Sequence, residues 1–281
     1  MDNPEEHRAT IKRFIAKMPS LSTTTSKVLE ICSRADASPN ELNRVVSLDP
    51  VLTGQVLKLI NSAYYSLANK VTSLTRAITM LGMNTVKNMA LSTAIIRVVG
   101  GVKKSQALPT AKFWKHSLAV GVAAKLLATA REIPIGEREE LFVAGLLHDL
   151  GKVPFGDEYI AALHQARKQQ RPLIEMENEL LGVNHQEIGL LIAEKWMLNP
   201  TITSGIGHHH DEEMPTDKVA FVALADVFVN IHEIGSAGNP FPREEDLLRL
   251  LDALSMDIGD LRPLHDQLLA EVRRAEVFLE L

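Results

Sequence analysis

One short stretch, Leu146-Leu147-His148-Asp149-Leu150-Gly151-Lys152, places a histidine and a carboxylate at the end of an apolar helix. Counted from Leu141, residues Gly145, His148 and Asp149 follow at the spacing that keeps side chains on one helical face. Both polar side chains are therefore expected to point into the core. A buried carboxylate needs a cation, strong hydrogen-bond donors or a proton, and a metal ion would supply the cation. For this dipeptide alone, an Asp that accepts backbone amides beside a hydrogen-bonded His is the structural alternative.

The other histidines gather in the same part of the chain, since only His7 lies upstream of residue 116. Three polar residues fall on predicted apolar helical faces: His116, His185 and Asp226. The run His208-His209-His210 is expected in a loop. A single His on such a face is more often a core residue bonded to a carbonyl than a metal ligand. Together with His148 and Asp149, however, the set favours a metal site built from imidazoles and carboxylates.

Composition narrows the class of protein and of partner. With 46% hydrophobic residues, the 281-residue chain is long enough for one large globular domain or two small ones. A net charge of −5 offers no basic surface, so no nucleic-acid partner is expected. Cys32 is the only cysteine, which excludes an internal disulfide and a thiolate-built metal site.

Nothing in the sequence predicts a membrane association. The charged residues near the N-terminus leave no apolar signal-peptide core. The longest apolar run, Val219–Ile231, is interrupted by Asp226 and is too short to span a bilayer. We therefore expect a cytoplasmic protein.

Helical periodicity runs through nearly the whole chain, which predicts an all-α fold. Ser38 and Asp49, each followed by Pro, are predicted helix caps. Gly82 should end one helix and Asn84 should cap the next, which would end at Gly100-Gly101.

The Gly- and Lys-containing segment 100–109 is the best candidate for a subdomain boundary. It divides the chain into an N-terminal helical subdomain, 1–108, and a metal-bearing helical subdomain, 109–281. The last helices, which contain Leu247 and Leu268, are expected either to pack on the metal-bearing half or to form a dimer contact.

The order of these residues resembles a known superfamily. His116, His148-Asp149, His185, the His run and Asp226 follow one another as in the HD superfamily of metal-dependent phosphohydrolases, and more narrowly its HD-GYP branch. In the first half, three phrases resemble those of the related HDOD family of bacterial signalling modules: Leu48-Asp49-Pro50-Val51-Leu52, Asn61-Ser62-Ala63-Tyr64-Tyr65 and Ala77-Ile78-Thr79-Met80-Leu81-Gly82. The resemblance covers about residues 17–232 and implies an HD-like multi-helix bundle preceded by an N-terminal helical subdomain.

The resemblance also implies two divalent metal ions. By analogy, one ion would be held by His116, His148, Asp149 and Asp226. The second would be held by Asp149, His185, His209 and His210. An imidazole and carboxylate set suits iron, manganese, zinc, cobalt or nickel, and the HD-GYP resemblance favours iron, then manganese. The remaining histidines of this half are not assigned as ligands: His164, His208, His232 and His265.

A phosphohydrolase or phosphodiesterase is the function that this resemblance implies, acting on a phosphoester or nucleotide. Two cations would activate a water molecule for attack on phosphorus, with Asp149 and Lys152 as the residues nearest to the chemistry. Lys152 would stabilise charge on a phosphate oxygen, unless it is a surface lysine at a helix C-terminus. The Gly-Tyr-Pro phrase is absent, because Asp211-Glu212-Glu213-Met214-Pro215-Thr216 stands in its place, so cyclic di-GMP is not the expected substrate.

Two functions of other classes stay open. In the first, the chain is a non-catalytic signalling or scaffold module that binds a protein partner and keeps a structural or sensory metal site. In the second, a di-iron centre senses redox state or a diatomic gas.

Overall fold

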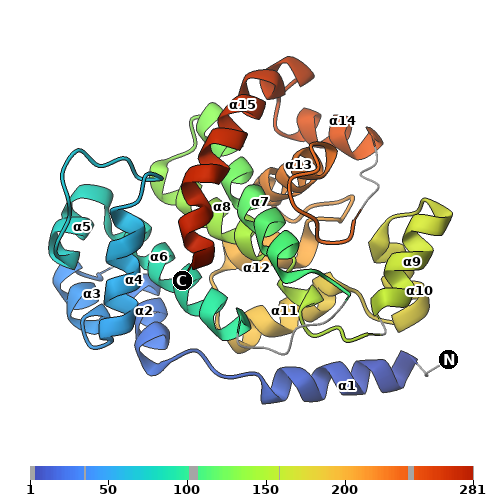
Figure 1. The fold of residues 1–281 in the computed structure, drawn as a ribbon, viewed down its shortest axis with the longest axis horizontal. Coiled ribbons are helices and arrows are strands. Elements are labelled where there is room, and N and C mark those ends of the chain that lie inside the picture. The colour runs from blue at the N-terminus through green and yellow to red at the C-terminus, as the bar shows by residue number, and fades with distance from the viewer. Residues whose placement is uncertain (1–3, 35, 101–106, 158, 240–243, 281) are drawn as a thin grey trace.

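The computed structural model describes residues 4–34, 36–100, 107–157, 159–239 and 244–280. Fifteen α-helices and two short 3₁₀ helices follow one another in these ranges, and no strand occurs among them (Figure 1). The prediction of an all-α fold is confirmed.

The N-terminal part is built around one buried helix. Its helices are α1 (Pro4–Lys17), α2 (Thr23–Ser33), α3 (Pro39–Val46), α4 (Pro50–Ile60), α5 (Leu74–Leu81) and α6 (Met83–Gly100). Helix α6 contacts α2, α3, α4 and α5, and it also contacts α8 of the second part. Every residue of α6 from Thr85 to Ile96 is buried, so this helix forms the core of the N-terminal part and joins it to the second part.

Helix α1 lies away from α2–α5 and runs along the lower edge of the molecule (Figure 1). It packs on α10 and α11 of the second part. At its C-terminal end, Lys195 Nζ donates hydrogen bonds to the carbonyls of Ile15 and Met18, at 2.6 and 2.9 Å. A cation at a helix C-terminus is favoured because the exposed carbonyls carry partial negative charge. The subdomain boundary at residues 108–109 stays a prediction.

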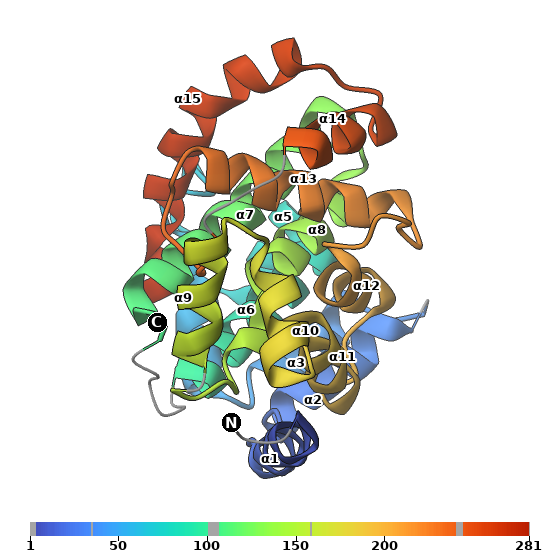
Figure 2. The ribbon, with the colours of Figure 1, turned by 90° about the vertical axis from the view of Figure 1, so that its right-hand side faces the viewer.

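The second part contains the predicted site. Its elements are α7 (Thr110–Ala130), α8 (Ile135–Leu147), η1 (Leu150–Lys152), α9 (Tyr159–Gln169), α10 (Leu173–Leu181), α11 (His185–Lys195), α12 (Pro200–His208) and α13 (Asp217–Ile231). In Figure 2, α9 and α10 lie in front of this bundle and α12 lies beside α11. Across the described ranges, none of the helices combines the length and the apolar character that a membrane span requires.

Two glycines let α7 and α8 pack closely. A Cβ on Gly145 would lie 2.8 Å from both Gly121 Cα and the Val120 carbonyl oxygen. A Cβ on Gly121 would in turn lie 2.7 Å from the Phe142 carbonyl oxygen. Since real Cβ atoms do not approach backbone atoms so closely, larger residues here would force the helices apart.

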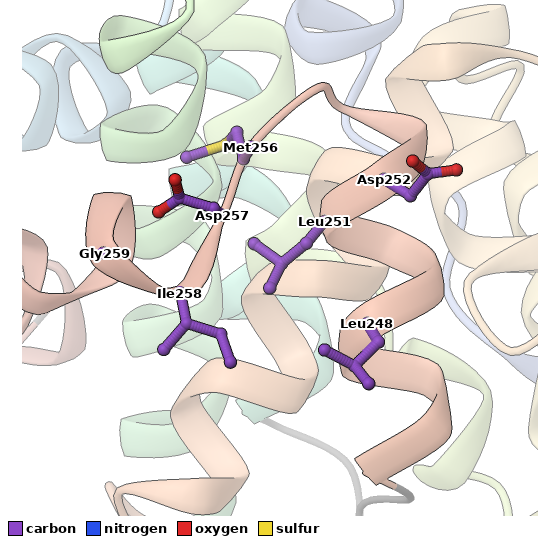
Figure 3. A pocket seen from close by; sticks show the side chains of 7 residues that line it. All are labelled: Leu248, Leu251, Asp252, Met256, Asp257, Ile258 and Gly259. Carbon is purple, nitrogen blue, oxygen red and sulfur yellow. The ribbon is translucent and has the colours of Figure 1, made fainter.

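The C-terminal helices pack on α7 and α13 of the second part. Helix α15 (Ile258–Ala275) packs on α7, and α14 (Glu244–Ala253) packs on α13; the short η2 (Glu276–Glu280) follows. This packing is the first of the two arrangements expected from the sequence. Between α14 and α15 lies a shallow groove lined by Leu248, Leu251 and Ile258, with Asp252 and Asp257 at its edge (Figure 3).

Most predicted helix ends are found, and two need correction. Ser38 and Asp49 accept the predicted capping hydrogen bonds from the amides of Glu41 and Leu52. Asn84, in contrast, is not a cap, because α6 already begins at Met83 and the Gly82 carbonyl accepts from the Val86 amide.

The His run also differs from its predicted position. His208 is the last residue of α12, so only His209 and His210 follow the helix and the expected loop begins later. A helix that reaches His208 fixes the direction in which the next two side chains leave the backbone.

We predict that Gly145→Val destabilises the protein by about 2 kcal/mol, because the added atoms overpack the α7–α8 contact. The free energy of unfolding, measured by urea denaturation, tests this. The matched control is Gly54→Ala, whose Cβ would meet no atom within 4 Å and should not destabilise. Equal stability of the Gly145→Val variant and the wild type would contradict the close-packing argument.

Candidate metal centre

The structure brings together all seven residues predicted as metal ligands. They come from elements far apart in the sequence: His116 from α7, His148 and Asp149 from the end of α8, His185 from the start of α11, His209 and His210 from the end of α12, and Asp226 from α13. The close approach of α7 and α8 places His116 beside His148, with ring centroids 5.4 Å apart.

One group consists of His116, His148 and Asp226, whose ligand atoms all lie within 4.8 Å of one another. Asp226 Oδ1 is 3.0 Å from His116 Nε2 and 3.6 Å from His148 Nε2. Asp149 Oδ2 approaches the same histidines, at 3.9 Å from His116 Nε2 and 3.2 Å from His148 Nε2. Two imidazoles and two carboxylates therefore face one point.

A second group consists of His185, His209 and His210, again with ligand atoms within 4.8 Å of one another. The Nε2 atoms of His185 and His209 are 3.3 Å apart. Asp149 Oδ1 lies 3.5 Å from His185 Nε2 and 3.8 Å from His209 Nε2. Asp149 thus stands between the groups and turns one oxygen toward each.

The polar atoms that face the centre fit a metal ion. Asp149 Oδ1 and His148 Nε2 are buried and accept or donate no hydrogen bond within the described part of the chain. A buried carboxylate oxygen without a partner is costly, and cations relieve that cost. Imidazole and carboxylate donors without thiolate suit divalent transition metals.

Hydrogen bonds on the outer side of the rings fix their orientation. His148 Nδ1 donates to the Gly145 carbonyl at 2.7 Å, and His209 Nδ1 lies 3.0 Å from the Gly205 carbonyl. The carboxylate of Asp226 is oriented as well, because Asn230 Nδ2 donates at 2.8 Å to Oδ1, the oxygen that faces His116. With Nδ1 engaged in this way, Nε2 of each ring is left to face the centre, which is the usual arrangement for metal-binding histidines.

Sequence reasoning missed the strongest of these outer partners, Glu177. This buried carboxylate on α10 accepts from His185 Nδ1 at 2.6 Å and from the His185 amide at 2.9 Å. Its other oxygen accepts from the Tyr159 hydroxyl. The signal was present, because Glu177 follows Leu173 by four and precedes Leu181 by four, so an acid interrupts an apolar helical face.

Gln186 holds the end of α12 in place. Its side-chain amide donates to the Gly207 carbonyl at 2.7 Å and to Asp211 Oδ1 at 2.8 Å, and its oxygen accepts from the His210 amide at 2.8 Å. Asp211 Oδ2 pairs with His208 Nδ1 at 2.7 Å. His208 therefore lies next to the centre as a partner of Asp211 and belongs to neither group of ligand atoms, as expected.

Lys152 lies inside the site. It is only 2% exposed, and its Nζ is 2.8 Å from Asp149 Oδ2 and 3.2 Å from the Ala237 carbonyl. The alternative of a surface lysine at a helix C-terminus is therefore wrong. The chain forms the short helix η1 directly after Asp149, and this helix packs closely on the start of α11. The contact is so close that a Cβ on Gly151 would lie only 1.8 Å from the His185 carbonyl oxygen, and Lys152 is buried with it.

Burial and neighbouring charges shift the pKa values of the site residues in different directions. Although burial favours a neutral ring, Asp149 and Asp226 raise the pKa of His148 to about 10. Although burial favours a neutral carboxyl, His148 and Lys152 hold the pKa of Asp149 well below its usual range. In the second group, burial and the neighbouring His185 lower the pKa of His210 to about 4, so this ring is neutral and ready to coordinate.

The centre is deeply enclosed. His148 and His185 are fully buried and Asp226 is 4% exposed, whereas His210 is half-buried and is the most accessible of the seven. Glu212 and Glu213, which follow shortly after it in the chain, are exposed.

Solved structures share this fold. An HDOD domain protein of unknown function from Geobacter sulfurreducens superposes with a TM-score of 0.76, with 26% identity and 98% of each chain covered. A proposed metal-dependent phosphohydrolase from Shewanella amazonensis gives a TM-score of 0.65, with 19% identity and 99% of each chain covered. At that identity, the second likeness shows the fold alone.

Curated relatives are longer than this chain. An uncharacterized protein from Treponema pallidum is 25% identical over 211 residues, which are 72% of this chain and 39% of that protein. Ribonuclease Y from Bacillus subtilis is 33% identical over 135 residues, which are 47% of this chain and 19% of that protein. The chain thus spans less than two fifths of the length of either relative.

The family itself is clear from the sequence match. The HDOD domain matches residues 18–212, which is more than half of the chain and includes every predicted ligand except Asp226. The resemblance noted in the first half is thereby confirmed, and the chain belongs to the HDOD domain family.

Proposed function

We propose that this HDOD protein is a signalling protein with a dinuclear metal centre that hydrolyses a phosphoester. The observation that carries the proposal is the position of Asp149, which turns one oxygen toward each group of histidines. A single carboxylate in this position suits two cations held side by side. His116, His148 and Asp226 would hold one ion, and His185, His209 and His210 the other, with iron the first choice and manganese the second.

Two cations bound there would supply Lewis-acid activation of a water molecule and of phosphate oxygens. The protein contributes orientation and charge. The outer hydrogen bonds of His148, His185 and His209 hold their rings in place, and enclosure excludes bulk water. Lys152, as the cation next to the shared carboxylate, would stabilise charge that develops on a phosphate oxygen.

The comparisons support a phosphoester or nucleotide as the substrate class. Proteins with the same fold include proposed phosphohydrolases. Ribonuclease Y, which matches part of this chain, is by its name an enzyme that cleaves RNA. The net charge of −5 and the exposed Glu212 and Glu213 disfavour a long polyanion and favour a small substrate. Cyclic di-GMP remains disfavoured because the Gly-Tyr-Pro phrase is absent.

The enclosure of the centre favours a second candidate function. With Asp149 only 1% exposed and His148 and His185 fully buried, the site resembles a structural or sensory metal site in a signalling or scaffold module. Turnover under metal-replete conditions separates the two functions, because a sensory site would bind metal without hydrolysing any phosphoester.

We predict about two metal ions per chain in protein purified without an affinity tag or chelator, and almost none in Asp149→Ala. His164→Ala is the matched control, since this exposed His on α9 lies outside both ligand groups and should leave the metal content unchanged. Elemental analysis by mass spectrometry gives the stoichiometry. Equal metal content in the two variants would refute the ligand assignment.

We predict that Lys152→Gln lowers kcat for phosphoester hydrolysis about 100-fold while the metal content stays near that of the wild type. The reason is that Lys152 pairs with Asp149 Oδ2 and is not itself a ligand. A screen of phosphomonoesters, cyclic nucleotides and linear dinucleotides provides the substrate. An active Lys152→Gln enzyme would remove this residue from the chemistry, and inactivity of the metal-replete wild type on every compound would support the sensory function.

We predict that metal binding at pH 8 releases about one proton per chain, from His148. With a pKa of about 10 this ring is protonated at pH 8 in the metal-free protein, whereas an ordinary His would already be neutral. Because the pKa of His148 is raised in the fold, its protonated ring also stabilises the metal-free fold below pH 6.5, and this contribution is lost as the pH rises to about 10. Calorimetry in two buffers of different ionisation enthalpy measures the release, and no release at pH 8 would contradict the assignment.

A further inference from the structure

Helix α4 contains a glycine that the packing of this chain does not explain. Gly54 is the fifth of eleven residues in α4, where glycine is among the least favourable helix formers. A Cβ at this position would meet nothing within 4 Å, and the backbone is in the ordinary helical region. Gly145 allows two helices of the chain to touch, whereas Gly54 faces open space.

That open space is a groove of about 740 Å³ on the surface of the N-terminal part. Helix α4 forms one wall, with Gly54, Leu57 and Lys58, and the segment 67–72 forms the other. The second wall is tied to the helix, because the Asn61 side chain exchanges two hydrogen bonds with the Val71 backbone, at 2.7 and 2.8 Å. The groove is therefore formed before anything binds in it.

The surface around Gly54 is apolar along the helix. Val51 is 57% exposed and lies one turn before Gly54 on the same face of α4. Leu48, 68% exposed, precedes the first residue of the helix by two positions. Two aliphatic side chains so exposed near the start of α4 favour contact with another apolar surface.

The charge of the groove is positive in a chain of net charge −5. Both titratable residues that line it are lysines, Lys58 and Lys70, and no acidic residue lines it within the described chain. Glu280 reaches Lys58 from the edge, with its carboxylate 3.5 Å from Lys58 Nζ. Because both partners of this pair are exposed, a competing carboxylate can replace Glu280 at little cost.

From these observations we propose that the α4 groove binds an amphipathic helix of a partner protein. Apolar residues of that helix would pack on Val51 and Leu57, and its acidic residues would face Lys58 and Lys70. The missing Cβ of Gly54 would let the two helix backbones approach closely at the centre of the contact. This function is independent of the metal centre and gives the N-terminal part a binding role of its own.

A second copy of this chain is the competing occupant. On α14, Leu248 is 54% exposed, and Glu245 and Asp252 on the same helix are exposed as well (Figure 3 shows Leu248 and Asp252). Such a contact would join different surfaces of two copies, so it must either form twice in a reciprocal dimer or continue into a ring or filament, a geometric demand that a separate partner helix does not make. We therefore favour a different protein, and the test separates the two.

The test uses the full chain and two synthetic helices of about 16 residues, one of leucine, alanine and glutamate and one with lysine in place of glutamate. Fluorescence anisotropy should show the acidic helix binding at least about tenfold more tightly than the basic one, with weaker binding at high salt. The double variant Lys58→Glu, Lys70→Glu should lose about tenfold in affinity for the acidic helix. The control Lys17→Glu, Lys168→Glu changes two exposed lysines elsewhere and should leave the affinity unchanged.

Gly54 itself gives the sharper comparison. Gly54→Ala should raise the melting temperature by about 2 °C, because it improves helix propensity and clashes with nothing in the chain. Gly54→Leu should fold but lose binding of the acidic helix. Equal binding of the two helices, binding of neither, or a lower melting temperature in Gly54→Ala would overturn the proposal. Self-association of the wild type in sedimentation velocity that is lost in Leu248→Glu would instead assign the groove to a second copy.

Discussion

The structure of the second half depends on how the charge of Asp149 is balanced inside the protein. An ionised carboxylate in a core is unfavourable unless cations or donors surround it. Here Lys152 supplies one cation at 2.8 Å, and protonated His148 supplies another at 3.2 Å. The five helices that carry the candidate ligands converge on this one carboxylate. The packing of these helices therefore also determines which side chains face one another in the site.

Small residues make this convergence possible. Gly121 and Gly145 bring α7 and α8 into contact, which sets the separation of His116 and His148. Gly151 allows η1 to touch the first residue of α11, which brings His185 toward Asp149. The positions of the ligand atoms are thus determined by backbone approach as much as by the side chains that surround them.

Apolar periodicity was sufficient to predict the all-α fold and to single out the polar residues on buried helical faces, whereas the choice of His209 and His210 as ligands came from the resemblance to the HD-GYP branch. Polar residues such as His116 and Asp226 stood out because they interrupt buried helical faces, and burial of polar groups demands a partner. Glu177 interrupts a face in the same way, but an acid on a helix is usually solvated, so it was passed over. The burial of Lys152 could not be inferred, because it depends on a 3₁₀ turn and on a contact with the distant Ala237 carbonyl.

The two oxygens of Asp149 have a consequence for any ions that bind. Since one carboxylate faces both groups, a cation bound to the first oxygen withdraws electron density and charge from the second. Occupancy of each group then alters the affinity of the other, and thermodynamic linkage makes this influence mutual and equal in free energy. Two ions would therefore fill such a centre in two coupled steps, the second weaker than the first, rather than as two independent sites.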